Sequence, residues 1–174
     1  MIDLNKAEEK LKTLVNAKRF THSLNVRDEA VKLAQIYGAD TEKAKIAGLL
    51  HDNAKDVPQD KALEICEQNK IELLDTEKAN PQVLHAPVGA ALLLPLFGVD
   101  DEEIKSAVRW HTLGSDSMTL LEKIIYIADI IEPTRTFEGV EILRKLAYIS
   151  LDDTVIEAKR QIQEMLRRRE NEKL

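Results

Sequence analysis

The stretch Ala47–Lys55 (AGLLHDNAK) places a histidine and an aspartate side by side at the end of an apolar segment. A carboxylate that is removed from water must be paired, protonated or bound to a cation. A fold that buries His51 and Asp52 must therefore bring other groups to them from elsewhere in the chain. A metal ion is the natural partner for such a pair, so further ligands are expected in other segments.

The spacing of apolar residues predicts an all-helical protein. Six glycines and five prolines fall mostly between segments that are rich in Leu, Ala, Glu, Lys and Ile, and no segment shows convincing strand-like alternation. We expect helices at 3–17, 20–37, 41–53, 59–69, 85–97, 101–112, 118–131, 139–148 and 151–171. The helix at 118–131 is apolar on nearly every side and should be buried, although it contains Asp129. Residues 70–84 are expected to form a long loop.

Length and composition fit one domain of ordinary size. The chain has 174 residues, of which 44% are hydrophobic and 32% are charged, which is enough to bury a single core. We predict one domain over residues 1–174, with a core at about 15–150 and a C-terminal packing helix at about 151–171. The single cysteine, Cys66, excludes an intramolecular disulfide. Without a signal peptide or a membrane-spanning apolar run, the sequence favours the cytoplasm and no membrane partner.

The net charge of −6 argues against a nucleic-acid partner, because such proteins usually coat phosphates with Lys and Arg. The basic cluster Arg167–Arg169 lies among glutamates and is interpreted as a solvated helix face. Exposed apolar positions on the terminal helices permit a homodimer without requiring one.

Four histidines lie at or near the ends of expected helices, where side chains from different helices can converge. They are His22, His51, His85 and His111. A lone histidine in such a place is most often structural, but four of them with Asp52 and Asp129 favour a metal site. Imidazole nitrogens and carboxylate oxygens suit Fe, Mn, Zn or Ni, and a single cysteine excludes a thiolate zinc site. Asp52 either shares one ion with His51 near the helix end or bridges two ions.

Four sequence blocks occur in order: Arg19–Ser23 (RFTHS), Gly48–Lys55, His111–Gly114 (HTLG) and Tyr126–Arg135 (YIADIIEPTR). Together they resemble the signature of the bacterial YqeK family, within the all-helical HD-domain metal-dependent phosphohydrolases. The resemblance covers about residues 15–150 and implies a single-domain HD-type helical bundle. The chain departs from the commoner family wording at Phe20 and Leu113, which concerns substrate contacts more than the metal centre.

The resemblance implies a symmetrical diadenosine tetraphosphate hydrolase that yields two ADP. Its centre would contain two divalent ions, usually iron, with Mn, Co, Ni or Zn as alternatives. One ion would be held by His22, His51, Asp52 and Asp129. The other would be held by His85 and His111, with Asp52 bridging.

The chemistry can be argued from the residues as well. Two cations about 3.5–4 Å apart can acidify a bridging water, so that a metal-bound hydroxide attacks the phosphoanhydride. Asp52 and Lys55 are the candidate catalytic residues, and the candidate phosphate contacts are Lys55, Arg135 and Arg19. Alternatively, Lys55 caps a helix, Arg135 pairs with Glu132 or Glu138, and Arg19 forms a surface ion pair. The aromatic side chains that could flank a purine, but are more often core, are Trp110, Phe97 and Tyr126.

Two other functions stay open at the level of sequence. The same centre could act on a mono-, tri- or cyclic nucleotide, because a fold does not fix a substrate. A non-catalytic nucleotide-binding protein would be expected to lack some ligands, whereas all six candidates are present. The expected partner is therefore a dinucleoside polyphosphate or another nucleotide.

Overall fold

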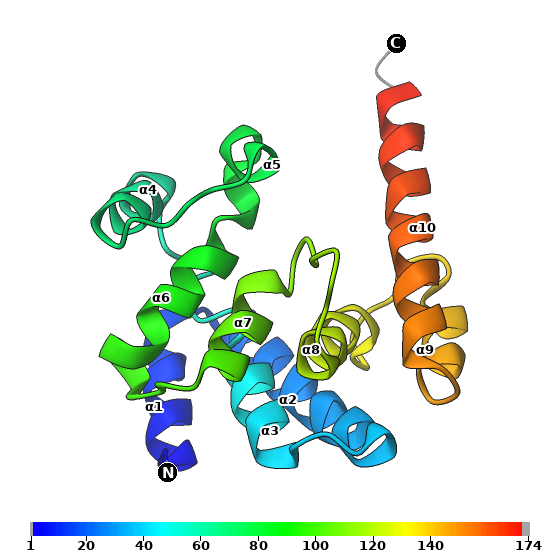
Figure 1. The fold of residues 1–174 in the computed structure, drawn as a ribbon, viewed down its shortest axis with the longest axis horizontal. Coiled ribbons are helices and arrows are strands. Elements are labelled where there is room, and N and C mark those ends of the chain that lie inside the picture. The colour runs from blue at the N-terminus through cyan, green and yellow to red at the C-terminus, as the bar shows by residue number, and fades with distance from the viewer. Residues whose placement is uncertain (1, 172–174) are drawn as a thin grey trace.

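The computed structural model describes residues 2–171, with side chains to residue 168, and contains helices but no strand in that range. Figure 1 shows the arrangement of these helices. Their bounds are α1 Leu4–Leu14, α2 Ala17–Tyr37, α3 Thr41–Leu50, α4 Gln59–Gln68, α5 Asp75–Ala79, the 3₁₀ helix η1 Pro81–Val83, α6 His85–Phe97, α7 Glu102–Trp110, α8 Leu120–Ile131, α9 Val140–Ala147 and α10 Leu151–Asn171. The predicted all-helical fold class is confirmed.

Several helix ends follow from local side-chain chemistry. The carboxylates of Asp3 and Asp40 accept hydrogen bonds from the first free N–H groups of α1 and α3, and Gly38 ends α2 with φ of 72°. The prediction that the first helix runs to residue 17 is wrong. Val15 is extended, and the side chain of Asn16 accepts from the Arg19 N–H as the N-cap of α2.

The prediction of a long loop at 70–84 is also wrong. This segment contains α5 and η1, and its Glu77 is fully buried. A five-residue helix is too short to show a helical apolar period, so the sequence carried no such signal. The predicted helix at 41–53 ends instead at Leu50, and a series of turns carries residues 51–56.

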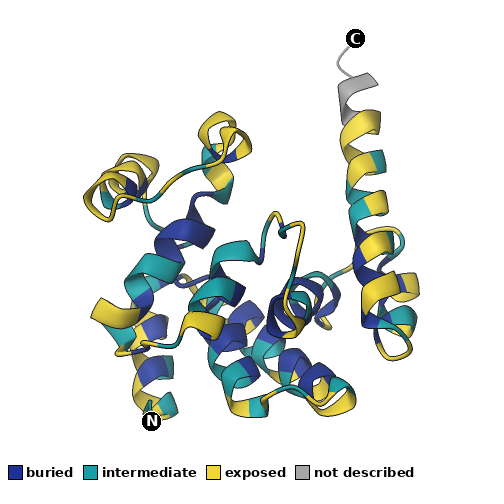
Figure 2. Cartoon of the chain, in the orientation of Figure 1, coloured by how far each residue is buried: buried dark blue, intermediate teal, exposed yellow. Residues whose placement is uncertain are grey.

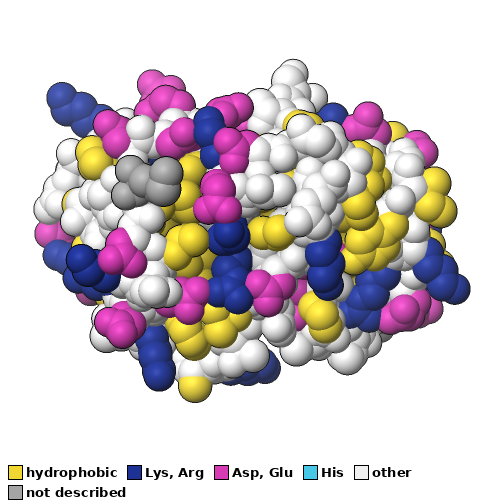
Figure 3. Space-filling view, turned by 90° about the horizontal axis from the view of Figure 1, so that it is seen from below, with side chains coloured by type: hydrophobic (Ala, Val, Ile, Leu, Met, Phe, Trp, Pro, Cys, Tyr) yellow, Lys and Arg dark blue, Asp and Glu magenta, His cyan; other side chains and the backbone are white. Residues whose placement is uncertain are grey.

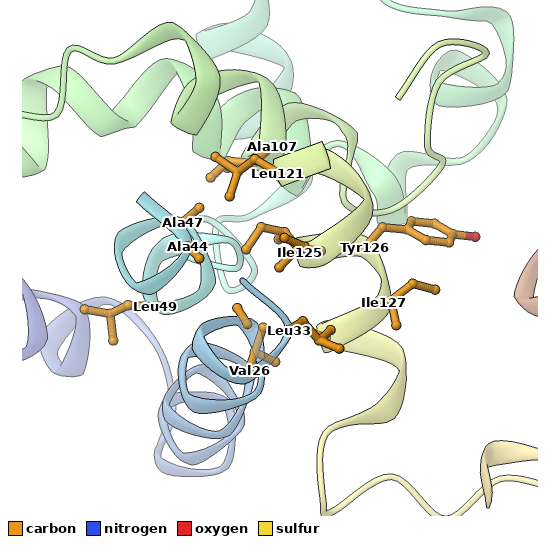
Figure 4. Packing of buried hydrophobic residues seen from close by; sticks show 14 of the residues in the cluster. Val26, Leu33, Ala44, Ala47, Leu49, Ala107, Leu121, Ile125, Tyr126 and Ile127 are labelled. Atoms are coloured by element: carbon orange, nitrogen blue, oxygen red, sulfur yellow. The ribbon is translucent and has the colours of Figure 1, made fainter. Parts of the chain in front are cut away.

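The core forms around α8, as predicted, and Figure 2 shows α8 largely in the colour of buried residues. Figure 4 shows side chains of α2, α3, α7 and α8 that face one another, among them Val26, Ala44, Ala107 and Ile125. A smaller apolar cluster, which includes Cys66 of α4 and Val88 of α6, joins those two helices. The helix α10 packs on α8 and α9 at the outside of the bundle (Figure 1).

Gly48 allows α2 and α3 to approach closely. A Cβ atom at this position would lie 2.8 Å from Cα of Arg27 and 3.2 Å from Cβ of Ala30. We expect Gly48→Ala to lower the free energy of unfolding by about 2 kcal/mol, because overpacking outweighs the gain in helix propensity. Urea unfolding measures this. A Gly48→Ala protein as stable as the native chain would contradict the close approach.

Charged side chains of both signs alternate over the face drawn in Figure 3, and no described histidine reaches the surface there. On α10, Arg160 pairs with Glu157 and Glu164, and Arg168 lies 3.5 Å from Glu138. The side chain of Arg169, in the predicted basic cluster, lies outside the described residues. Within the described chain, no helix combines the length and the apolar character needed to cross a membrane.

Candidate metal centre

Helix ends bring the six predicted ligands together at one place. His22 lies in the second turn of α2, His51 and Asp52 follow α3, and Asp129 lies in the last turn of α8. His85 begins α6, and His111 follows the last residue of α7. All of these side chains are buried except that of Asp129, which is 18% exposed.

Three of the four histidines are oriented by the same kind of hydrogen bond to the backbone. The Nδ1–H groups of His51, His85 and His111 each donate to the backbone carbonyl three residues earlier, at 2.7–2.8 Å. In α3 and α7 this carbonyl belongs to the last helical turn, where it has no partner within the helix. The hydrogen bond fixes the tautomer, so that Nε2 presents its lone pair to the interior.

Asp52 lies between two groups of histidines. Its Oδ2 atom is 3.4 Å from Nε2 of His51 and 3.7 Å from Nε2 of His22. Its Oδ1 atom is 3.1 Å from Nε2 of His85 and 3.3 Å from Nε2 of His111. The two oxygens of one carboxylate therefore face two different pairs of ring nitrogens, as in a carboxylate that bridges two ions.

The other distances fit ligand atoms grouped around a cation. The Nε2 atoms of His22 and His51 lie 3.2 Å apart, as do those of His85 and His111. Oδ1 of Asp129 is 3.0 Å from Nε2 of His22 and 3.7 Å from Nε2 of His51. Ligands bound at about 2.1 Å to one ion are separated by about 3.0–3.4 Å, so these separations suit a metal. Facing lone pairs at such distances repel unless a proton or a cation lies between them.

The charges of the cluster favour a cation as well. Burial raises the pKa of Asp52 and of Asp129, but their contacts with histidines outweigh it and hold both pKa values well below the usual range. Burial lowers the pKa of His51, but the two carboxylates outweigh it and raise that pKa to about 10. A proton on His51 thus competes with a metal ion for the same carboxylates, and we expect metal binding to release it.

All three predicted phosphate contacts lie beside this cluster. Nη1 of Arg19 is 2.6 Å from Oδ2 of Asp52, and Nη2 of Arg135 is 2.7 Å from Oδ1 of Asp129. Nζ of Lys55 lies 3.3–3.4 Å from the two ring nitrogens of His85, and burial lowers its pKa.

The purely structural roles considered for Lys55, Arg135 and Arg19 fit their contacts less well. Lys55 contacts the ring of His85, and no hydrogen bond to a described helix carbonyl is present. Arg135 lies closer to Asp129 than to Glu132, from which it is 3.7 Å away. Glu138 lies instead near Arg168. Arg19 pairs with a buried carboxylate of the cluster rather than with a surface group.

Sequence reasoning missed several residues that support the cluster. Glu132 is buried and accepts a hydrogen bond from Nδ1–H of His22 at 3.1 Å. Arg109 donates two hydrogen bonds to Glu77, which ties α5 to α7 two residues before His111. The amide of Asn53 donates to the carbonyls of Leu50 and Gly89 and so links α3 to α6. Glu132 and Asn53 stand within the recognised blocks, which is the one signal that could have found them.

Two of the three aromatic candidates for purine stacking, Tyr126 and Phe97, belong to the packing of the core. Tyr126 is buried in the core, and Phe97 is partly buried and packs against that core. The guanidinium of Arg109 lies over the Trp110 ring, 4.3 Å from the centroid. A groove of about 690 Å³ between the end of α4, α6 and α7 is lined by Pro87, Ala91 and Leu94 among others. These three residues lie on the side of α6 opposite His85, at about 100° per residue, so the groove faces away from the cluster.

Comparison with known proteins identifies the family. Residues 19–134, more than half of the chain, match the HD domain. The chain therefore belongs to the HD domain family, which confirms the resemblance found in the sequence blocks.

Two bacterial proteins are similar to the chain over most of its length. The chain is 46% identical over 142 residues to the protein of Bacillus subtilis (strain 168) named bis(5'-nucleosyl)-tetraphosphatase, symmetrical, and the match covers 80% of this chain and 75% of the relative. The protein of the same name from Staphylococcus aureus is 41% identical over 158 residues, which cover 90% of this chain and 81% of that one.

A solved structure is similar throughout. The crystal structure of a "predicted HD superfamily hydrolase involved in NAD metabolism" from Clostridium acetobutylicum matches with a TM-score of 0.91 and 44% identity. The match covers 97% of this chain and 89% of that chain. The HD-type helical bundle expected from the sequence is confirmed.

Proposed function

We propose that this chain is a metal-dependent hydrolase that cleaves diadenosine tetraphosphate symmetrically to two ADP. The observation that carries the proposal is the position of Asp52, whose two oxygens face different pairs of histidines. Such a carboxylate suits a bridge between two ions, and two-ion sites are common in phosphoryl transfer. The names of the Bacillus subtilis and Staphylococcus aureus relatives support the same activity.

We assign the ligands of two divalent ions to the two sides of Asp52. The ligands on the Oδ2 side are His22, His51, Asp52 and Asp129. The ligands on the Oδ1 side are His85 and His111, with Asp52 shared. We propose iron as the metal, and the same nitrogen and oxygen donors accept Mn, Co, Ni or Zn. When bound, the two ions acidify a water molecule and neutralise charge on the phosphate oxygens.

The cations of the chain orient the substrate in this proposal. A planar guanidinium matches phosphate oxygens in a bidentate manner, so Arg19 and Arg135 can exchange their carboxylate partners for the polyphosphate. Lys55 lies on the His85 side, where its ammonium would stabilise the charge that develops on the departing ADP. Asp52 orients the reacting groups through the ions and does not act as a general base.

Product analysis tests the substrate and the position of cleavage. The chain is freed of metal, loaded separately with Fe, Mn, Co, Ni or Mg, and incubated with diadenosine tetraphosphate; iron is handled without oxygen. We expect two ADP for each substrate consumed, and we expect a chelator to abolish the reaction. A product mixture of AMP and ATP would contradict symmetrical cleavage.

A second candidate is another nucleotide substrate, because the Clostridium acetobutylicum protein is described as involved in NAD metabolism. The same assay on NAD and on mono-, tri- and cyclic nucleotides separates the two candidates. Rapid cleavage of one of these, with diadenosine tetraphosphate untouched, would replace the first proposal. Failure to cleave any of them, with ions bound, would favour a non-catalytic nucleotide-binding protein.

Three further predictions remain proposals. We propose that residues 1–174 form one domain with a core at about 15–150. The single, buried Cys66 suits a reducing cytoplasm.

Exposed apolar side chains on α9 and α10, such as Ile142 and Ile156, permit a homodimer without requiring one. Analytical sedimentation would measure the oligomeric state.

A further inference from the structure

Glu132 is a buried carboxylate beside the centre that is not itself among the proposed ligands. It follows the last residue of α8 and is 1% exposed. Oε1 accepts from Nδ1–H of His22 at 3.1 Å and from the Thr134 hydroxyl at 2.5 Å. Oε2 accepts from the Asn25 amide at 3.1 Å and from the Thr134 N–H at 2.8 Å. Four hydrogen bonds fix this carboxylate in place.

The turn that carries Glu132 is itself held firmly. The guanidinium of Arg144 donates to the backbone carbonyls of Ile131, Glu132 and Arg135 at 2.8–2.9 Å. The Ile131 carbonyl would otherwise lack a partner at the end of α8, whereas the Glu132 carbonyl also accepts from the Arg135 N–H at 3.0 Å. Glu132 is therefore positioned before any ion binds. Ion binding then loses no conformational entropy in ordering this side chain.

His22 differs in this respect from the other three histidines. Their Nδ1–H groups donate to backbone carbonyls, which are neutral, whereas that of His22 donates to a carboxylate. A charged partner on Nδ1 orients the ring and makes Nε2 a stronger electron donor. His22 is thus the one histidine of the four with a charged hydrogen-bond partner, which raises its strength as a ligand more than a neutral carbonyl does.

The two sides of Asp52 also differ in charge. The side of His22 has a second carboxylate ligand, Asp129, with Glu132 behind it, whereas the side of His85 has only Asp52 and has Lys55 against the ring. Arg19 and Arg135 place positive charge near the first side, but their side chains are 27% and 37% exposed. Water screens their charges more than it screens the buried Glu132.

We propose that Glu132 is a positioning residue that makes the His22 side the tighter of the two ion sites, so that this side is filled first. The inference rests on the two-ion centre of the proposed function but not on its substrate. It predicts two unequal binding steps, of which the first depends on Glu132.

The experiment is a titration of the metal-free chain with Co²⁺, followed by calorimetry and by the visible spectrum of the bound ion. The native chain should bind two ions per chain in two steps. Glu132→Gln should weaken the tighter step by about 10–100-fold and change the spectrum of the first ion, as loss of a carboxylate behind a ligating histidine does elsewhere. The weaker step should stay within a factor of about two, because no ligand on the side of His85 contacts Glu132.

Glu122→Gln is the matched control. Glu122 is a buried glutamate in the first turn of α8, and it accepts hydrogen bonds from Ser106, Ser115 and Thr119 rather than from a histidine. Its replacement should leave both binding steps unchanged. If Glu132→Gln does not fold, as judged by circular dichroism, Glu132→Asp replaces it and should weaken the same step by a smaller factor.

Three results would overturn the inference: equal weakening of both steps, no effect on the first step, or the same effect in Glu122→Gln. Because the titration uses no nucleotide, it is independent of the substrate assay. Two unequal steps in a chain that cleaves no diadenosine tetraphosphate would leave the inference standing and remove the proposed function. A single bound ion would remove both.

Discussion

Asp52→Asn is expected to remove at least one bound ion per chain and to lower turnover by at least about 10³-fold. The side chain keeps its size, but one carboxylate oxygen becomes an NH₂ group that cannot bind a cation. Both oxygens of Asp52 face ring nitrogens within 3.7 Å. Either orientation of the amide therefore replaces an oxygen ligand of one ion site by an NH₂ group. Metal analysis of the purified protein and single-turnover assays would measure the two losses.

The control for this prediction is Asp56→Asn, four residues further along the chain. Asp56 is exposed and accepts hydrogen bonds from the backbone and side chain of Asn16, without contact to any described histidine. Its replacement should leave metal content and turnover unchanged. If Asp52→Asn also retained two ions and full turnover, the assignment of the bridge, and with it the two-ion centre, would be wrong.

The sequence predicted most of the fold because helices leave strong local signals. Apolar residues at helical spacing identified the nine helices of eight residues or more in the described part of the chain. Burial of α8 followed from its apolar residues on nearly every side. The short helix α5 was not predicted, because five residues cannot show the helical spacing of apolar side chains.

The sequence predicted which side chains would meet, but not how they are supported. The histidines stood out because each lay near an expected helix end, and the structure gathers them with Asp52 and Asp129. The supporting contacts join distant segments: Glu132 is 110 residues from His22, and Arg109 is 32 residues from Glu77. A buried glutamate and a surface glutamate look alike in a sequence, so no local pattern could separate them.

One regularity of the centre could be sought in other sequences. His51 and His111 each stand one residue beyond a helix and donate Nδ1–H to the carbonyl three residues earlier. The same hydrogen bond satisfies a helix carbonyl and orients a ligand, so helix termination and ligand geometry share one interaction. A histidine just after the end of a helix is therefore a better ligand candidate than one in the middle of it.

Lys55→Met is expected to lower kcat by about 10²-fold while leaving both ions bound. Nζ of Lys55 lies against the ring of His85, and no ion pair with a described carboxylate competes for its charge. The charge is therefore available to the anionic leaving group, where it counts most in the transition state. Methionine keeps much of the length and apolar stem of the side chain, so the loss should reflect the ammonium rather than packing. Steady-state kinetics on diadenosine tetraphosphate, with metal analysis of the same samples, would measure it.

The matched control is Lys61→Met, which removes the same charge from an exposed side chain that pairs with Glu64 at the surface of α4. It should leave kcat and metal content unchanged, whereas Lys55→Arg should restore part of kcat because it restores the positive charge. An equal loss in Lys55→Arg and Lys55→Met would mean that geometry rather than charge is required. If Lys55→Met instead lost an ion, Lys55 would support His85 as a ligand, and the stabilisation of the departing ADP would have to come from Arg19 or Arg135.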